Sequence, residues 1–249
     1  MNAHTISLTA VTVSLALLTG GCTAPTQQAT RPGDAPLSPE PTTPIDWLTT
    51  STFSPTFSVR DTESSLGPYD ALLKELTLND LVRMHGHACD GLVTAAAAFR
   101  VGLDELYPQG VIDRTDTGCL TNNSPCFGDV AAYLTGGRIR FGTQKIDPSM
   151  GSRFLIHRFS TQETVEVALR PGLFPEALRE LETKVRGGHC TQQELLACQA
   201  AQWAFARGLL QRPLTESFTI RRLPEFVWTP DVYSQRGRRG DIINRDWAR

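Results

Sequence analysis

Apolar side chains recur at helical spacing in several parts of the chain. The strongest example is residues 92–106, where four consecutive alanines favour a helix and the leucines and Phe99 form one apolar face. A shorter helix before it starts with Thr77 or Asn79 as its cap and ends at about His85. The whole pattern predicts helices over residues 69–76, 77–85, 92–106, 175–186 and 191–210.

Segments rich in β-branched and apolar residues, bounded by glycine or proline, predict strands. The two clearest are residues 153–159 and 164–169, which only a few residues separate, so we expect them to pair antiparallel. Further strands are expected over residues 138–141 and 217–220. Helices packed with a mostly antiparallel sheet place the chain in the α+β class.

The first 22 residues have the pattern of a signal peptide. Residues 6–18 are apolar apart from Ser and Thr, and they are too few to span a bilayer as a mature helix. The run Leu18-Thr-Gly-Gly-Cys22 resembles a bacterial lipobox, in which the cysteine is lipidated and becomes the first mature residue. We therefore expect an exported protein, anchored in the bacterial cell envelope by a lipid on Cys22. Because no Lys or Arg precedes Ile6, a secreted soluble protein and a retained membrane anchor stay open as alternatives.

Composition divides the rest of the chain into three parts. Residues 23–44 hold six of the sixteen prolines and few large apolar side chains, which predicts an extended tether. Residues 45–230 carry the predicted elements and are expected to form one core domain, followed by a basic, solvated tail over residues 231–249. Membrane contact is then expected through the lipid anchor alone.

The charge balance does not indicate a polyanionic partner. The chain has 24 Lys and Arg against 26 Asp and Glu, a net charge of -2, so it lacks an overall positive field. We therefore do not expect nucleic acid as a partner.

The residues with chemical potential are concentrated in a short run after the second predicted helix. His85, His87 and Cys89 are separated by single residues, and imidazole and thiolate are good ligands for zinc and other divalent transition metals. Their side chains converge only if the backbone is extended or tightly turned, and Gly86 and Gly91 supply that freedom. The spacing predicts a metal site; the alternative is a surface turn with two hydrogen-bonded histidines and one buried thiol.

The same run carries a family resemblance. Leu81-Val-Arg-Met-His-Gly-His-Ala-Cys-Asp-Gly-Leu92 is similar to the His-Gly-His-x-Cys-Pro-Gly signature of the formylmethanofuran dehydrogenase E-subunit family. Residues 126–137 resemble that family's Cys-x-x-Asp segment, and residues 209–222 resemble the end of its core domain. The sequence departs from the pattern at Asp90, where the family has proline, and at Gly137, where it has a third cysteine.

The resemblance implies an α+β core, often dimeric, with a metal ion, commonly zinc, in a pocket that could also hold a small molecule. At the matching positions it implies His85, His87, Cys89 and Cys126 as metal ligands, with Asp129 as the acceptor that orients a ligand histidine. The alternative for Cys126 is a pocket nucleophile beside an open coordination position. No reaction is firmly attached to the family, so no catalytic residue is assigned.

Two polar residues outside these motifs are weaker candidates. Asp116 is expected either to orient a ligand histidine or to be a solvated loop acid. His157 lies in the middle of a predicted strand and is expected to be packed and hydrogen-bonded, with a position facing the pocket as the alternative.

Cysteine pairing competes with metal ligation. Cys190 and Cys198 flank the start of a helix, and we expect a disulfide between them. If Cys119 and Cys126 pair, Cys126 is lost as a ligand; if Cys126 holds the metal, Cys119 is a spare thiol or a replacement ligand.

Two functions are consistent with these patterns. The first is an envelope protein that binds zinc or another divalent transition metal, and we favour it. The second is a thiol-disulfide redox protein that uses Cys89, Cys119 or Cys126. Nothing in the sequence matches a phosphate-binding glycine loop, a nucleophile elbow or a paired-carboxylate site, so no reaction is predicted.

Overall fold

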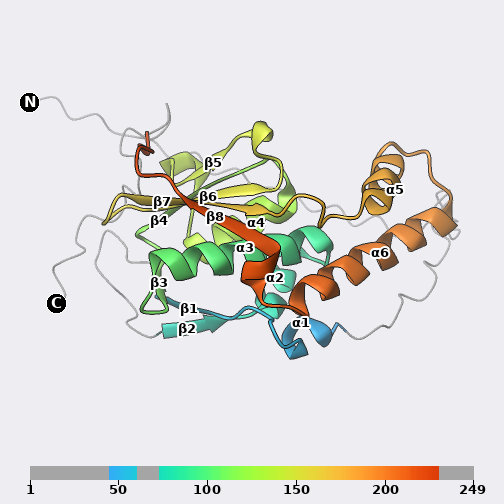
Figure 1. The fold of residues 1–249 in the computed structure, drawn as a ribbon, viewed down its shortest axis with the longest axis horizontal. Helices are drawn as coiled ribbons and strands as arrows, with labels where there is room; N and C mark the ends of the chain where they lie inside the picture. Colours follow the sequence, from blue (N-terminus) through green and yellow to red (C-terminus); the bar gives the residue numbers. More distant parts are fainter. Residues whose placement is uncertain (1–44, 61–72, 230–249) are drawn as a thin grey trace, which may run out of the picture. The chain divides into compact units, whose positions relative to one another are not determined.

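The computed structural model describes residues 45–60 and 73–229, which are coloured in Figure 1. The expected signal peptide, Cys22, the tether and the basic tail lie outside the described residues, as do residues 69–72 of the first expected helix. Within the described part, no helix is both long and apolar enough to cross a bilayer.

The larger sheet has five strands in the order β5-β4-β6-β7-β8. These strands are β4 (Thr117–Thr121), β5 (Gln144–Ile146), β6 (Arg153–Arg158), β7 (Glu163–Leu169) and β8 (Phe218–Arg222). β6 and β7 pair antiparallel, as the sequence predicts, with registers from Arg153↔Ala168 to Arg158↔Glu163. β4–β6 and β7–β8 are also antiparallel, whereas β4 and β5 run parallel.

The smaller sheet has the order β2-β1-β3. It consists of β1 (Phe57–Arg60), β2 (Leu73–Leu76) and β3 (Val111–Asp113), with β1 antiparallel to β2 and parallel to β3. Among the described strands, four of the six pairings are therefore antiparallel. The α+β class is confirmed, although both sheets are mixed.

Helices account for most of the remaining described residues. They are α1 (Trp47–Thr50), α2 (Leu78–His85), α3 (Asp90–Leu106), α4 (Pro125–Thr135), α5 (Glu176–Arg186), α6 (Gln192–Leu210) and α7 (Leu214–Ser217), with the short 3-10 helices η1 (Ile139–Phe141) and η2 (Pro148–Met150). α2, α3, α5 and α6 match helices that the sequence predicts, within a few residues at each end. α4 was not predicted.

Two predictions of local structure were wrong. Residues 73–76 are strand β2 rather than part of a helix, because they pair with β1 from Phe57↔Leu76 to Arg60↔Leu73. Residues 138–141 contain η1 rather than a strand, because the chain turns between Gly136 and Gly142, both at φ +64°. The structure of the first segment is decided by pairing with a distant strand and that of the second by a glycine turn. The local pattern of apolar and polar residues decides neither.

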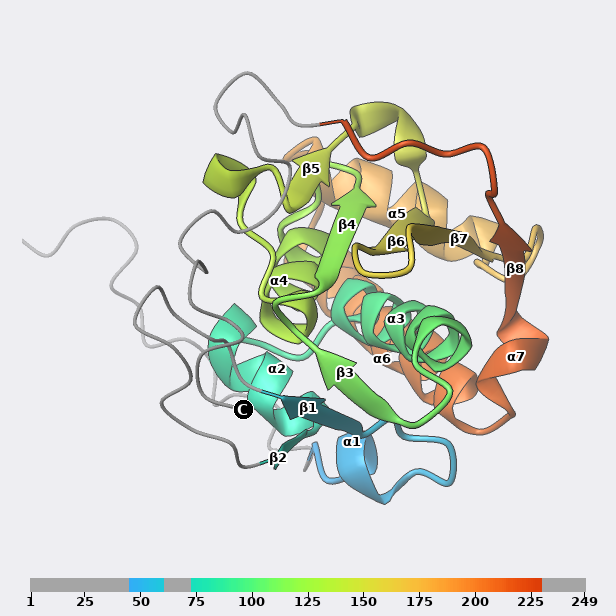
Figure 2. The ribbon, with the colours of Figure 1, turned by 90° about the vertical axis from the view of Figure 1, so that its left-hand side faces the viewer.

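Helix α3 lies between the two sheets (Figure 2). Thirteen of its seventeen residues are buried, which is expected of a helix enclosed on most sides. Gly102 allows its backbone to lie directly on β6 and β7. A Cβ added there would be 2.6 Å from Cδ1 of Ile156 and 2.8 Å from Cγ2 of Val167.

The segment after β8 runs back across the five-stranded sheet on the side away from α3 (Figure 2). There the ring of Trp228 stacks on His157 with centroids 5.4 Å apart, and its Nε1 donates to the carbonyl of Gly142 at 2.8 Å. His157 is fully buried, and its Nδ1 bonds the hydroxyl of Thr164 at 2.7 Å. His157 is therefore packed and hydrogen-bonded, as expected, and is not the pocket-facing histidine of the alternative. Burial lowers its pKa to about 4.

Gly102→Ala is expected to lower the free energy of unfolding by about 1–3 kcal/mol, because a methyl group there overpacks against β6 and β7. The matched control is Gly128→Ala in α4, where the added Cβ would meet only Nε2 of Gln144, at 3.7 Å. Alanine favours a helix over glycine by roughly 1 kcal/mol, so the control should not destabilise. Urea unfolding followed by circular dichroism measures both. Equal stability of the two variants would contradict the close packing of α3.

The stability of the fold should decrease as the pH falls from about 6.5 to about 4. The unfolded chain binds a proton at the ordinary pKa of histidine, 6.5, whereas folded His157 binds it only at about 4. Stability is therefore lost across this window, by about 2.5 kcal/mol at pH ~4.5. His157→Gln should remove this part of the pH dependence in urea unfolding at pH ~7.5 and ~4.5. Identical pH dependence in the variant and the parent would refute the assignment.

Candidate metal centre

The His85 to Cys89 turn joins two helices whose ends are set by local sequence. Gly86, at φ +99°, ends α2, and its N–H bonds the carbonyl of Val82 at 2.7 Å. Cys89 is the extended N-cap of α3, and its sulfur accepts from the N–H of Leu92 at 3.3 Å. The helix end predicted at His85 is therefore confirmed.

The turn brings three of the predicted ligands together. The ligand atoms of His85, His87 and Cys89 all lie within 4.8 Å of one another. Nε2 of His85 is 3.9 Å from the Cys89 sulfur, and the two imidazole rings have centroids 4.5 Å apart. Cys89 is buried, His85 is half-buried and His87 is exposed, so the group is open to solvent on the His87 side.

Cys126 adjoins this group through Cys89. It is the second residue of α4, and its Sγ lies 3.4 Å from the Sγ of Cys89. Gly91 makes the approach possible, because a Cβ at that position would be 3.1 Å from both Cβ and Sγ of Cys126. The N-termini of α3 and α4 therefore meet at two sulfur atoms.

Asp129 holds the ring of His85. Its Oδ2 is 2.8 Å from Nδ1 of His85, which leaves Nε2 as the ring nitrogen nearest Cys89. Asp129 lies one turn after Cys126 on α4, so a single helix presents both residues to the turn. The geometry fits the orienting contact that a ligand histidine commonly has.

Asp116 lies elsewhere and has a different role. Its carboxylate bonds Nε of Arg158 at 3.2 Å, the backbone N–H of Ser160 at 2.8 Å and the Ser160 hydroxyl. It is buried, not a solvated loop acid. These contacts tie it to the turn between β6 and β7, and the described hydrogen bonds include none from Asp116 to a predicted ligand.

The described cysteines are unpaired in the structure, which does not show the disulfide expected between Cys190 and Cys198, so that pairing stays a prediction. Cys119 is fully buried in β4, where its sulfur lies 3.6 Å from the hydroxyl of Thr135. Burial raises the pKa of Cys119 to about 12. Cys126 therefore contacts Cys89 and not Cys119.

Helices α5 and α6 add groups that the sequence did not reveal. Nε1 of Trp203 donates to the carbonyl of Ala88 at 3.1 Å, inside the turn. Burial, and then the charge of Glu182, raise the pKa of Asp90 to about 7. Glu182 of α5 and Trp203 of α6 are each about a hundred residues from the motif in the sequence. No spacing rule connects them with it.

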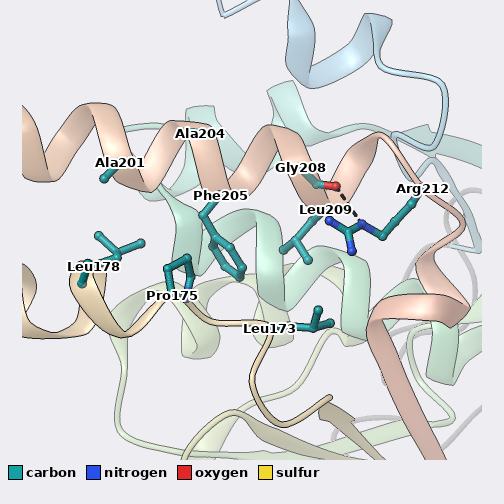
Figure 3. A pocket seen from close by; sticks show the side chains of 10 residues that line it. Leu173, Pro175, Leu178, Ala201, Ala204, Phe205, Gly208, Leu209 and Arg212 are labelled. Atoms are coloured by element: carbon teal, nitrogen blue, oxygen red, sulfur yellow. Dashed lines mark hydrogen bonds between the residues drawn. The ribbon is translucent and has the colours of Figure 1, made fainter.

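A cavity of about 440 Å³ lies between α6 and the segment leading into α5 (Figure 3). Its lining is apolar apart from Arg212, whose Nε donates to the carbonyl of Gly208 at 3.2 Å. The predicted metal ligands do not line this cavity. It is therefore separate from the candidate metal centre.

The pKa values of the two adjacent thiols are shifted in opposite directions. The pKa of Cys126 is lowered to about 6, first by the hydrogen bond from Cys89 and then by the charge of His85. The same hydrogen bond, together with burial, raises the pKa of Cys89 far above its ordinary value. In the metal-free protein the electrostatics of the pair therefore favour a thiolate on Cys126 over one on Cys89.

Iodoacetamide is expected to alkylate Cys126 in the native, metal-free protein with a half-maximal rate at about pH 6, because alkylation requires the thiolate. Cys119 is the internal control, since its burial should protect it under the same conditions. Peptide mass spectrometry across a pH series measures both. A half-maximal rate for Cys126 at pH ~8.5 or above would contradict the lowered pKa.

Comparison with known proteins agrees with the resemblance found in the sequence. The family model described as "FmdE, Molybdenum formylmethanofuran dehydrogenase operon" matches residues 84–219. A solved tungsten formylmethanofuran dehydrogenase FmdE-like protein from Syntrophus aciditrophicus is similar over 59% of this chain and 72% of that chain, with 14% identity and a TM-score of 0.40. No curated protein matches the chain. The family model spans more than half of the chain and includes His85, His87, Cys89, Cys126 and Asp129, so this protein belongs to the FmdE family.

Proposed function

We propose that this protein binds a divalent transition metal ion, zinc in preference, through His85, His87, Cys89 and Cys126. The observation that carries the proposal is the convergence of the first three ligand atoms to within 4.8 Å of one another. Membership of the FmdE family supports it. The signal-peptide pattern and the Cys22 lipobox support a place in the bacterial cell envelope.

The donor set fits zinc in both kind and number. Two imidazoles and two thiolates are a common tetrahedral zinc set, and the two thiolate charges would balance the charge of the ion. Two sulfurs bound to one tetrahedral zinc lie about 3.8 Å apart, and here Cys89 and Cys126 are 3.4 Å apart. The sulfurs therefore need only a small adjustment to share an ion.

Neighbouring groups hold the ligands in place. Asp129 fixes the ring of His85, and Trp203 anchors the turn through the carbonyl of Ala88. Both contacts reduce the freedom that the ligands would lose on binding, which favours a preorganised site.

The solvent side of the site is formed by His87. Because this side chain is exposed, the site is accessible from that direction to an incoming ion or to a small ligand. His87 is the ligand that an incoming ion or an acceptor protein would meet first. This arrangement supports storage or delivery of the metal as the simplest use of the site.

Loss of one ligand should abolish stable metal retention. We expect His87→Ala to retain less than about a tenth of the wild-type metal after dialysis, and Asp129→Asn to lower affinity by about 10–100-fold through the ring of His85. His189→Ala is the matched control, because His189 is exposed and lies in the loop between α5 and α6. Elemental analysis of the purified full chain, with zinc titration, measures all three. Unchanged metal content in His87→Ala would reject the site.

A further inference from the structure

The thiols of Cys89 and Cys126 lie in direct contact with each other. Their Sγ atoms are 3.4 Å apart, although 37 residues separate them in the chain. One sulfur is at the N-cap of α3 and the other is in the first turn of α4. Helix N-termini stabilise thiolates, so both positions favour sulfur chemistry.

We propose that Cys89 and Cys126 are a redox modification site, at which oxidation to a disulfide releases the metal ion. This inference rests on the proposed metal binding, because it adds a control to the same site. The oxidant is a disulfide, either of a small thiol such as glutathione or of a partner protein.

The structure allows the bond to form with little movement. A disulfide bond is about 2.05 Å long, so the two sulfurs must approach by roughly 1.4 Å, which side-chain rotation can supply. Gly91 leaves room for this, because no side chain separates the start of α3 from Cys126. Cys119 does not compete, since its sulfur is fully buried and contacts Thr135.

Exposure sets the order of the two steps. Cys126 is half-buried whereas Cys89 is 7% exposed, so an incoming disulfide reaches Cys126 first. The Cys126 thiolate attacks one sulfur of the oxidant, breaks its S–S bond and forms a mixed disulfide, and the first thiolate leaves and takes a proton from water.

The second step closes the bridge. Cys89, which is a thiolate in the metal-loaded protein, attacks the Cys126 sulfur and displaces the second thiolate, which takes a proton from water. The protein has then lost two electrons and the metal ion, and the oxidant has become two thiols with protons taken from solvent.

Closure of the bridge removes half of the donor set. Sulfurs joined in a disulfide carry no charge and are poor metal ligands, because metals bind the thiolate. His85 and His87 would remain as two neutral ligands, which is too few for a stable zinc site. Metal ion and disulfide are therefore mutually exclusive.

The test uses the full chain, reduced, loaded with zinc and then treated with glutathione disulfide. Zinc release is followed with a coloured chelator, and the bridge is mapped by tryptic peptides after alkylation of free thiols. Cys89 lies in peptide 84–100, and Cys119 and Cys126 share peptide 115–138, so fragment-ion sequencing must assign the bridged cysteine. We expect a Cys89–Cys126 bridge and one zinc ion released per bridge formed.

Variants test the order of the steps. Cys89→Ser should accumulate a glutathione adduct on Cys126, whereas Cys126→Ser should leave Cys89 reduced. Cys190→Ser is the matched control, because Cys190 precedes α6 and is not part of the site, and its zinc release should equal that of the parent.

The outcomes separate a failure of the redox inference from a failure of the proposed metal binding. Both thiols still reduced after treatment would overturn the inference and leave the proposed metal binding intact. A bridge formed while zinc is fully retained would overturn the inference and also the assignment of Cys89 and Cys126 as ligands. Zinc content is measured before oxidation, so a reduced chain that takes up no zinc would refute the proposed function and the release together. A bridge between other cysteines with zinc loss would also overturn the inference.

Discussion

The close approach of helix α3 to its neighbours is the constraint on which both the core and the candidate metal centre depend. Gly102 lets the middle of α3 lie on β6 and β7, and Gly91 lets its N-terminus meet Cys126. The two glycines are eleven residues apart, three turns of helix, so they fall on nearly the same face of α3. Any change in how α3 packs against the sheet therefore also moves Cys89 relative to Cys126.

The turn that carries the ligands is held from two further sides. Asp129 of α4 contacts His85, and Trp203 of α6 contacts the carbonyl of Ala88. One helix thus orients a ring and the other fixes the backbone between the two histidines and the cysteine. Because these contacts come from segments remote in sequence, the site forms only when the whole domain has folded.

The sequence predicted what local rules control and failed where distant contacts decide. The periodicity of apolar residues predicted α3. The glycines around His85 predicted the helix end at that residue and the convergence of His85, His87 and Cys89. The pairing of residues 73–76 with β1 and the burial of Asp116, which is hydrogen-bonded to Ser160, depend on segments far along the chain. The place of Cys126 beside Cys89 came only from the family resemblance, because a separation of 37 residues has no local signature.

The two departures from the family pattern have different physical consequences. A Cβ at Gly137 would lie 3.4 Å from the Cys119 sulfur and 2.9 Å from the Thr135 hydroxyl, so a third cysteine there would crowd groups that are already buried. The sulfur that fills this region belongs to Cys119, and its raised pKa disfavours the thiolate that a metal requires. Asp90 acts differently, because it places a carboxyl group in the first turn of α3 beside Cys89, where burial, and then the charge of Glu182, raise its pKa to about 7.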